Sequence, residues 1–202
     1  MTLGRLIARV TIGGLFVGHG TQKLFGWFGG PGLDGASKMM DSLELHPARR
    51  NALAAGTAEA TGGALLALGA LTPVAGSLIT SMMVTAIRKV HGPNGPWIQQ
   101  KGYEYNLALI ATMAALVECG PGAPSVDRAL GIEAKGSRWA LASIAVGAAG
   151  SALAIEAGRR FAEEPAEQPQ TAAPPEGEPR QRTGRFTRNG DAAEREYAGA
   201  TA

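Results

Sequence analysis

The sequence has little cysteine, little net charge and no motif for an electron carrier, and each shortage excludes a class of protein. The single cysteine, Cys119, excludes an intramolecular disulfide framework and a zinc site of the paired-cysteine type. A formal net charge of +2 is too small for a nucleic-acid footprint, so no nucleic-acid partner is expected. The chain contains no dinucleotide fingerprint, no paired cysteines and no haem-attachment motif. Any redox role therefore requires a partner that carries flavin or thiols, and no metal site is predicted.

The charges that are present are unevenly distributed along the 202 residues. Residues 159–202 hold 15 of the 36 formal charges, and long stretches of the remainder hold one or none. From Glu163 onward the chain consists mainly of Pro, Glu, Gln, Ala and Arg, which bury too little apolar surface to offset the entropy of ordering. The pattern predicts an apolar body followed by a disordered charged tail over residues 159–202.

Apolar segments of the body are long enough to cross a bilayer, which takes roughly 20 residues. They cover residues 6–28, 52–71, 74–90, 107–117 and 139–157, and the fourth needs its flanking residues to reach that length. A soluble helix would need a broad polar face, whereas the polar residues of segment 60–86 are only Thr and Ser. We predict an all-α integral membrane helical bundle with four core transmembrane helices in residues 1–131 and a fifth in residues 132–158.

Ionisable side chains from separate helices are expected to meet in one half of this bundle. The loops of residues 29–51 and 91–101 lie on the same side, which brings the end of the first helix near the start of the second. His19 and Lys23 share a helix face, and Glu59 lies about seven residues, or roughly 10 Å, into the second predicted helix. A carboxylate in hydrocarbon costs about 2.5–3.5 kcal/mol and needs a partner, for which Lys23 or His19 is available. Glu59, His19 and Lys23 are therefore candidate catalytic residues, and the alternatives are a structural ion pair and a Lys23 that extends to the headgroups.

Four short motifs carry a family resemblance that covers about residues 5–131. They are HGTQKLFGWFGGPG at residues 19–32, AEATGG at 58–63, VHGPNG at 90–95 and GYEY at 102–105. This set resembles the DoxX family of small bacterial integral membrane proteins. The resemblance implies a four-helix membrane bundle linked to quinone or thiol redox chemistry. The positions that match the family pattern are His19, Gln22, Lys23, Glu59, His91, Asn94, Tyr103 and Glu104.

The candidate site supports three functions. The first is a quinone- or thiol-redox-linked membrane component that works with a soluble oxidoreductase partner; His91, Asn94, Tyr103 and Glu104 are then candidate binding residues for a quinone or another small ligand. The second is a non-enzymatic membrane scaffold that docks such a partner. The third is a small-molecule transporter with Glu59 as its carrier group, for which the chain lacks inverted repeats. Whether the chain is itself an enzyme stays open, as does its oligomeric state.

Basic residues give an orientation in the bilayer, which is expected to be a bacterial plasma membrane crossed several times. The side that holds the candidate site carries Lys23, Lys38, Arg49, Arg50, Arg88, Lys89 and Lys101. The other side carries Arg5, Arg9, Arg128, Lys135 and Arg138. The positive-inside rule places the first side in the cytoplasm, together with the tail. On the other side, Arg9 is expected to pair with Glu118 or with a lipid phosphate.

Overall fold

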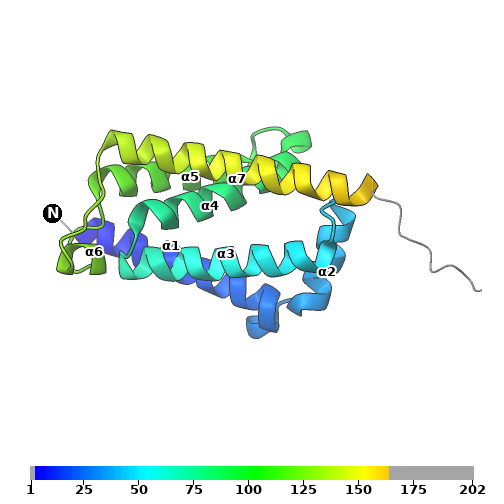
Figure 1. Cartoon of the computed structure of the whole chain (residues 1–202), viewed down its shortest axis with the longest axis horizontal. Coiled ribbons are helices and arrows are strands. Elements are labelled where there is room, and N and C mark those ends of the chain that lie inside the picture. Colours follow the sequence, from blue (N-terminus) through cyan, green and yellow to red (C-terminus); the bar gives the residue numbers. More distant parts are fainter. Residues whose placement is uncertain (1–2, 164–202) are drawn as a thin grey trace, which may run out of the picture. The chain divides into compact units, whose positions relative to one another are not determined.

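The computed structural model describes residues 3–163, and every regular element in that range is a helix. The predicted all-α class is confirmed. Five long helices run roughly side by side along the long axis (Figure 1). They are α1 (Leu3–Phe25), α3 (Ala48–Leu68), α4 (Thr72–Ala86), α5 (Glu104–Cys119) and α7 (Ser137–Glu163).

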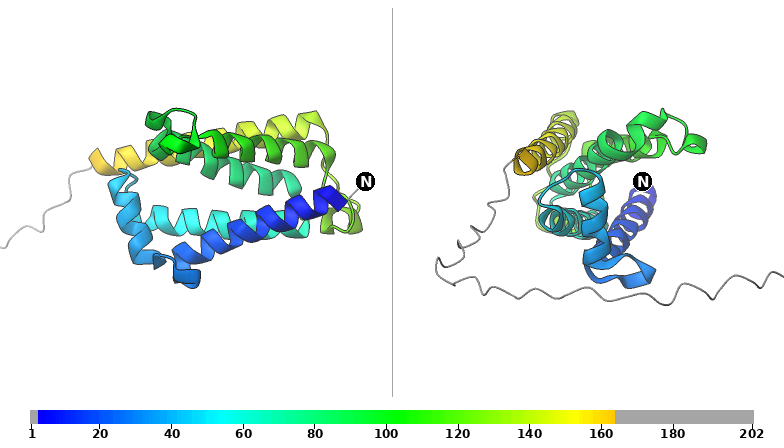
Figure 2. Two further views of the ribbon diagram at one scale, coloured as in Figure 1. Left: turned by 180° about the vertical axis from the view of Figure 1, so that it is seen from behind. Right: turned by 90° about the vertical axis from the view of Figure 1, so that its right-hand side faces the viewer.

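Short helices cross the bundle at its two ends (Figures 1 and 2). At one end, here named the α2 end, α2 (Gly32–Ser42) connects α1 to α3. At the other end, the α6 end, α6 (Val126–Ala129) lies between α5 and α7. Single turns complete the connections: η1 (Trp27–Gly29), the π-helical η2 (Ile87–His91), η3 (Gly92–Asn94) and η4 (Ile98–Gln100).

Glycines bring α1 and α3 into backbone contact. A Cβ atom placed on Gly13 would lie 2.5 Å from the carbonyl oxygen of Gly63, and one on Gly20 would lie 2.5 Å from that of Gly56. Real side chains do not fit at these distances, so only glycine allows this approach. Small residues serve this purpose in membrane bundles, where lipid removes the hydrophobic drive for helix association. The two helices therefore form one tightly packed unit.

Hydroxyl groups join α7 to α4. Ser151 lies 2.9 Å from the Thr85 hydroxyl, and the Ser143 hydroxyl donates to the carbonyl oxygen of Pro73 at 3.0 Å. Between them Gly147 packs directly against Thr80. The spacing of Ser143, Gly147 and Ser151 in the sequence thus corresponds to a packing face, and α7 is an integral part of the bundle.

Two apolar clusters fill the bundle between the helices. One comprises Phe16, Leu66, Ala75, Ile79, Leu109, Met113 and Leu116. The other gathers around α2 and comprises Ala36, Met40, Leu45, Ala52, Ala55 and Ile155. Met83 packs against the first cluster and Met82 against the second. The consecutive methionines of α4 therefore mark the border between the two clusters.

By length and composition, one helix of residues 3–163 is long and apolar enough to cross a membrane, and it is the segment Ser137–Phe161 of α7. The prediction of a spanning helix at residues 139–157 agrees with this result. The four core spans do not pass the same test. Helices α4 and α5 are short, with 15 and 16 residues, and α3 carries the charged residues Arg49, Arg50 and Glu59. Four core spans thus remain a prediction.

Two helix boundaries differ from the predicted ones, at the start of α3 and at the end of α7. Helix α3 begins at Ala48 rather than near residue 52, because Arg49, Arg50 and Asn51 are accommodated in its exposed or half-buried first turn. Helix α7 continues to Glu163, so residues 159–163 are helical rather than part of a tail. The rest of the predicted tail, residues 164–202, lies outside the described residues.

Candidate functional site

An ion pair between α1 and α3 is the centre of the candidate site. Lys23 Nζ lies 2.5 Å from Glu59 Oε2, and the side chains are only 18% and 8% exposed. Of the two predicted partners, Lys23 rather than His19 contacts the carboxylate. Glu59 lies 11 residues after Ala48, where α3 begins. That separation is about 16 Å along the axis rather than the predicted value of roughly 10 Å, which makes Glu59 a mid-helix residue.

The close approach of α1 to α3 explains why these two side chains meet. Gly20 contacts Gly56 and Ala60. Because α1 and α3 run antiparallel, Lys23 and Glu59 lie about one turn to opposite sides of this contact, and each side chain tilts toward the N-terminus of its own helix, that is, toward the other. With the helix backbones touching, the long lysine side chain reaches the carboxylate without leaving the bundle.

The ion pair faces a cavity of about 410 Å³, named here the Lys23–Glu59 cavity. Its volume falls in the range of small-molecule sites, about 300–1,000 Å³. Most of its wall is apolar and flexible, formed by Met39, Met40, Leu43, Leu45, Ala54, Ala55, Ala58, Met82, Met83, Ala86, Val90 and Ala154. Its polar wall consists of Lys23, Glu59, Asn51, Ser81, Thr85, Lys89 and His91. A mainly apolar wall with a few polar groups is typical of a binding site for an amphipathic small molecule.

The π-helical turn η2 contributes two polar groups to the wall, Lys89 and His91. Lys89 Nζ lies 3.9 Å from Glu44 Oε2, a long contact to a side chain that is 84% exposed. The Nδ1 of His91 lies 2.8 Å from the carbonyl oxygen of Lys101. Because a carbonyl oxygen only accepts, Nδ1 carries the proton of a neutral ring and Nε2 is its acceptor. Thus Lys89 adds a positive charge to the cavity wall, and His91 adds a group that can take up a proton.

The other predicted site residues lie outside the cavity wall. His19 is exposed on α1, where its Nδ1 lies 3.3 Å from the Gln22 side-chain oxygen. Asn94 donates to the carbonyl oxygens of Val90 and Lys101. The side chains of His19 and Asn94 thus make their hydrogen bonds within their own helix or loop.

Tyr103 and Glu104 likewise organise the loop before α5. Glu104 Oε1 accepts a hydrogen bond from the backbone N–H of Ile98 at 3.0 Å, and the N–H of Tyr103 donates to the carbonyl oxygen of Gly95. Of the residues predicted from the sequence, the cavity therefore unites Glu59, Lys23 and His91, but not His19, Asn94, Tyr103 or Glu104.

Sequence reasoning missed Lys89, which it counted only among the basic residues that set the orientation in the bilayer. In an α-helix the directions of the side chains at positions 88 and 89 follow from the period of 3.6 residues per turn. The π-helical η2 has wider turns with i to i+5 hydrogen bonds, so its side chains point in different directions. Single π turns inside helices occur frequently at functional sites. Nothing in the local sequence predicts this turn, although its position beside the VHGPNG motif could have drawn attention to it.

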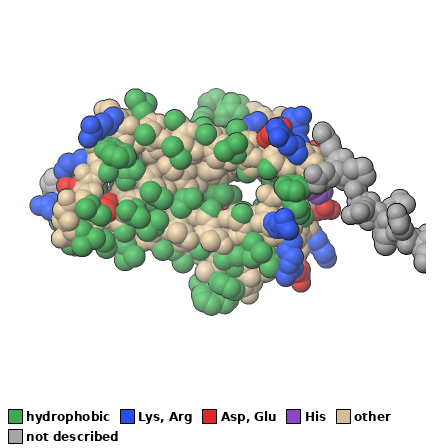
Figure 3. All heavy atoms as spheres, viewed as in Figure 1, with side chains coloured by type: hydrophobic (Ala, Val, Ile, Leu, Met, Phe, Trp, Pro, Cys, Tyr) green, Lys and Arg blue, Asp and Glu red, His purple; other side chains and the backbone are tan. Residues whose placement is uncertain are grey.

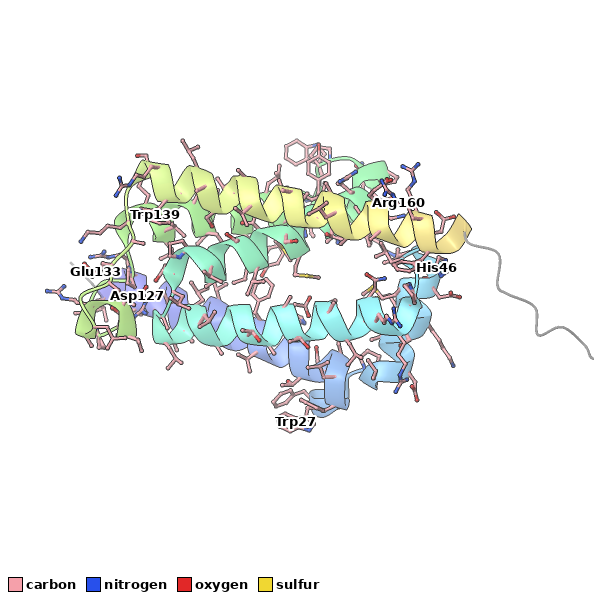
Figure 4. All side chains as sticks on the ribbon, viewed as in Figure 1. Trp27, His46, Asp127, Glu133, Trp139 and Arg160 are labelled. Carbon is pink, nitrogen blue, oxygen red and sulfur yellow. The ribbon has the colours of Figure 1, made fainter. Side chains whose placement is uncertain are left out.

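A second polar cluster lies at the α6 end, where Arg9 and Asp127 are buried (0% and 1% exposed). Arg9 Nη2 donates to the carbonyl oxygen of Pro124 at 2.6 Å. The expectation that Arg9 pairs with Glu118 or with a lipid phosphate was wrong: Arg9 is fully buried and donates to a backbone carbonyl, and Glu118 accepts a hydrogen bond from Ser137. Figure 4 shows Asp127 directed toward the bundle at this end.

Asp127 anchors α6 to the beginning of α4. Its carboxylate accepts hydrogen bonds from the N–H of Leu71 at 2.7 Å and from the N–H and hydroxyl of Thr72 at 3.0 and 2.7 Å. A carboxylate at a helix N-terminus satisfies amide groups that have no partner within the helix. The Asp127 carboxylate is thus used for structural contacts, whereas Nε and Nη1 of Arg9 are buried without a hydrogen-bond partner among the described residues.

Comparison with known proteins identifies one family. Residues 4–92 match the family model described as DoxX. The comparison with curated proteins found no match, and neither did the comparison with solved structures. The matched segment runs from α1 to η3, and it contains every residue of the cavity wall except Ala154 of α7.

Proposed function

Residues 4–92 make this chain a member of the DoxX family, a membrane family, and from that premise we propose that it is a multi-pass membrane protein that binds a quinone in the Lys23–Glu59 cavity. In this proposal it works with a soluble oxidoreductase partner of the plasma membrane's cytoplasmic face. The observation that carries the proposal is the buried ion pair of Lys23 and Glu59 on the wall of a largely apolar cavity.

The side chains of the cavity fit the chemistry of a quinone. A quinone ring is apolar apart from its carbonyl oxygens, which need hydrogen-bond donors, and the Lys23 ammonium supplies such donors at the apolar wall. Reduction to a quinol also takes up protons. Glu59 and His91 are the groups on the wall that can hold a proton and pass it on. A buried ionisable pair inside a membrane bundle typically marks such a pathway.

The electrons would come from the partner protein, since the sequence carries no electron-carrier motif. By chemical class we propose a dithiol protein. Oxidation of two thiols to a disulfide releases two electrons and two protons, and reduction of a quinone to a quinol consumes the same numbers. The reaction therefore balances without a further reactant. In this scheme the chain supplies the binding cavity and the proton path.

The proposed topology has α1, α3, α4 with η2, α5 and α7 crossing the bilayer and the α2 end in the cytoplasm. Exposed aromatic side chains support it, since Phe25, Trp27, Phe28 and Trp97 are 57–78% exposed near the α2 end, as expected for an aromatic belt at the interface. Figure 4 shows Trp27 directed away from the bundle. Figure 3 shows Lys and Arg side chains gathered at both ends and hydrophobic side chains between them.

The test compares Glu59→Gln with the matched control Asp34→Asn, an acid of α2 that is 88% exposed. Binding of decylubiquinone to each purified protein in detergent would be measured by titration, with thermal unfolding as the check on folding. We expect Glu59→Gln to weaken binding by at least about tenfold, which corresponds to loss of about 1.4 kcal/mol. The Asp34→Asn variant should bind like the parent. Equal binding by all three proteins would refute the proposed site.

A further inference from the structure

We propose that the ligand of the Lys23–Glu59 cavity enters sideways from the lipid, through an opening between α3 and α7 whose rim is formed by Ala54, Ala58 and Ala154. This rim is named the alanine portal. The inference rests on the proposed function and defines its substrate class: an amphipathic molecule with a small polar head and a long apolar tail. It also assigns a specificity-determining role to Ala154, the one wall residue outside the segment that matches the family.

The opening follows from the way the helices pack. Helices α3 and α7 each pack on α4, but they share few contacts with each other. Both nevertheless contribute to the cavity wall, through Ala54 and Ala58 on one side and Ala154 on the other. Four wall residues are exposed at the surface: Met39 of α2, Val90 of η2, Ala54 of α3 and Ala154 of α7. On α3 and α7, the exposed wall residues are Ala54 and Ala154, and the half-buried Ala58 lies one turn after Ala54. Figure 3 shows the surface hollowed between these two helices toward the α2 end, so the three alanines form the rim of an opening there.

The portal faces hydrocarbon because α7 is the helix that passes the length and apolarity test for a membrane span. Beside Ala154, Leu153 is 70% exposed, and Val146 two turns earlier is 61% exposed. Ala154 lies seven residues before Phe161, where the span ends. That is about 10 Å along the helix axis, a depth at which lipid chains rather than water surround the rim.

The arrangement of polar groups sets the direction in which a ligand lies. The three rim residues are alanines without polar side-chain atoms, so the portal offers nothing to a charged or polar group. Glu59 directly follows Ala58 and holds Lys23 inside the cavity. A polar head therefore lies inside against the ion pair, while the tail extends through the portal into the lipid. A membrane-dissolved isoprenoid quinone has this form.

The experiment narrows the portal with Ala154→Trp and uses Ala145→Trp as the matched control. Ala145 is exposed on the same helix, and nine residues at 100° per residue put it on the opposite face from Ala154. Equilibrium binding of decylubiquinone and of the corresponding quinone without a tail would be measured for both variants and the parent. We expect Ala154→Trp to weaken binding of the tailed quinone at least about tenfold and of the tailless quinone less than about twofold. Ala145→Trp should change neither.

Each of the other outcomes refutes either the portal or the proposed function. Unchanged binding of the tailed quinone by Ala154→Trp refutes the portal and leaves the cavity site standing. An equal loss of both quinones means that the indole fills the cavity, which also refutes the portal. If the parent binds neither quinone, the proposed function fails together with this inference. Should Ala154→Trp unfold at a lower temperature than the parent, Ala54→Leu on the opposite rim replaces it, with the same expected selectivity for the tailed quinone.

Discussion

Lys23 and Glu59 form an ion pair at 2.5 Å although Lys23 lies two residues from the end of α1 and Glu59 lies near the middle of α3. The C-terminal end of α1 therefore packs against the middle of α3, and the ion pair lies at that contact. Beyond that end, Met39 and Met40 of α2 form part of the cavity wall. A buried charge pair at such a position is sensitive to the loss of either member.

Replacing Lys23 by Met should lower the free energy of unfolding by about 3–5 kcal/mol, because the substitution leaves the Glu59 carboxylate buried without a counter-charge. The double variant Lys23→Met with Glu59→Leu should recover most of that loss, since apolar residues of similar volume can replace a buried pair. Unfolding in detergent measures both effects. Quinone binding should stay weak in the double variant, and recovery of binding together with stability would contradict the proposed role of the pair.

That Glu59 meets a basic residue of the first helix could be predicted from the sequence, whereas its depth in its helix and the cavity around it could not. Loop lengths place the end of the first helix beside the second, and the cost of an isolated acid in hydrocarbon requires a basic partner. The cavity, however, depends on how far α3 and α7 stand apart, which no local pattern encodes. The contribution of Lys89 depends on the π turn, and the role of Asp127 depends on contacts with Leu71 and Thr72, 55 or more residues earlier. Such long-range contacts become visible only in the folded chain.

A substitution of Gly13 by Ala should be far more harmful than the same change at Gly14. The Cβ atom at position 13 would lie 2.5 Å from the Gly63 carbonyl oxygen and 2.7 Å from the Ala67 nitrogen, so α1 must move away from α3. Overpacking of this kind costs about 1–3 kcal/mol. At Gly14 the Cβ meets no atom within 4 Å, and the higher helix propensity of alanine should raise stability by about 0.5–1 kcal/mol. Thermal unfolding of the two variants in detergent gives the comparison, and equal midpoints would contradict the backbone contact.

Substituting Asp127 by Ala should release α6 from α4. The change leaves the amide groups of Leu71 and Thr72 without their acceptor, and each hydrogen bond to a charged group contributes about 1.5–3 kcal/mol. Thr72→Val removes only the hydroxyl bond and should cost about 1 kcal/mol, which makes it the graded control. Amide hydrogen exchange should speed up at the first turn of α4 in Asp127→Ala. Unchanged exchange there would show that the cap is not needed to hold this turn.

The orientation of the bundle can be tested with the chain's own cysteine. Cys119 is exposed at the C-terminus of α5, at the α6 end, and Asp41 is exposed on α2 at the opposite end, where its side chain is 69% accessible. With the α2 end in the cytoplasm, a membrane-impermeant maleimide added to intact spheroplasts should label Cys119 in the parent. The variant that combines Cys119→Ser with Asp41→Cys should react only after permeabilisation. The reverse pattern would mean that the α2 end faces outward, and labelling of both positions in intact spheroplasts would contradict a bundle that crosses the bilayer. The basic residues of the α2 end outnumber those of the α6 end only slightly, so the positive-inside rule alone gives a weak orientation. This labelling experiment therefore decides on which face of the membrane a soluble dithiol partner must be sought.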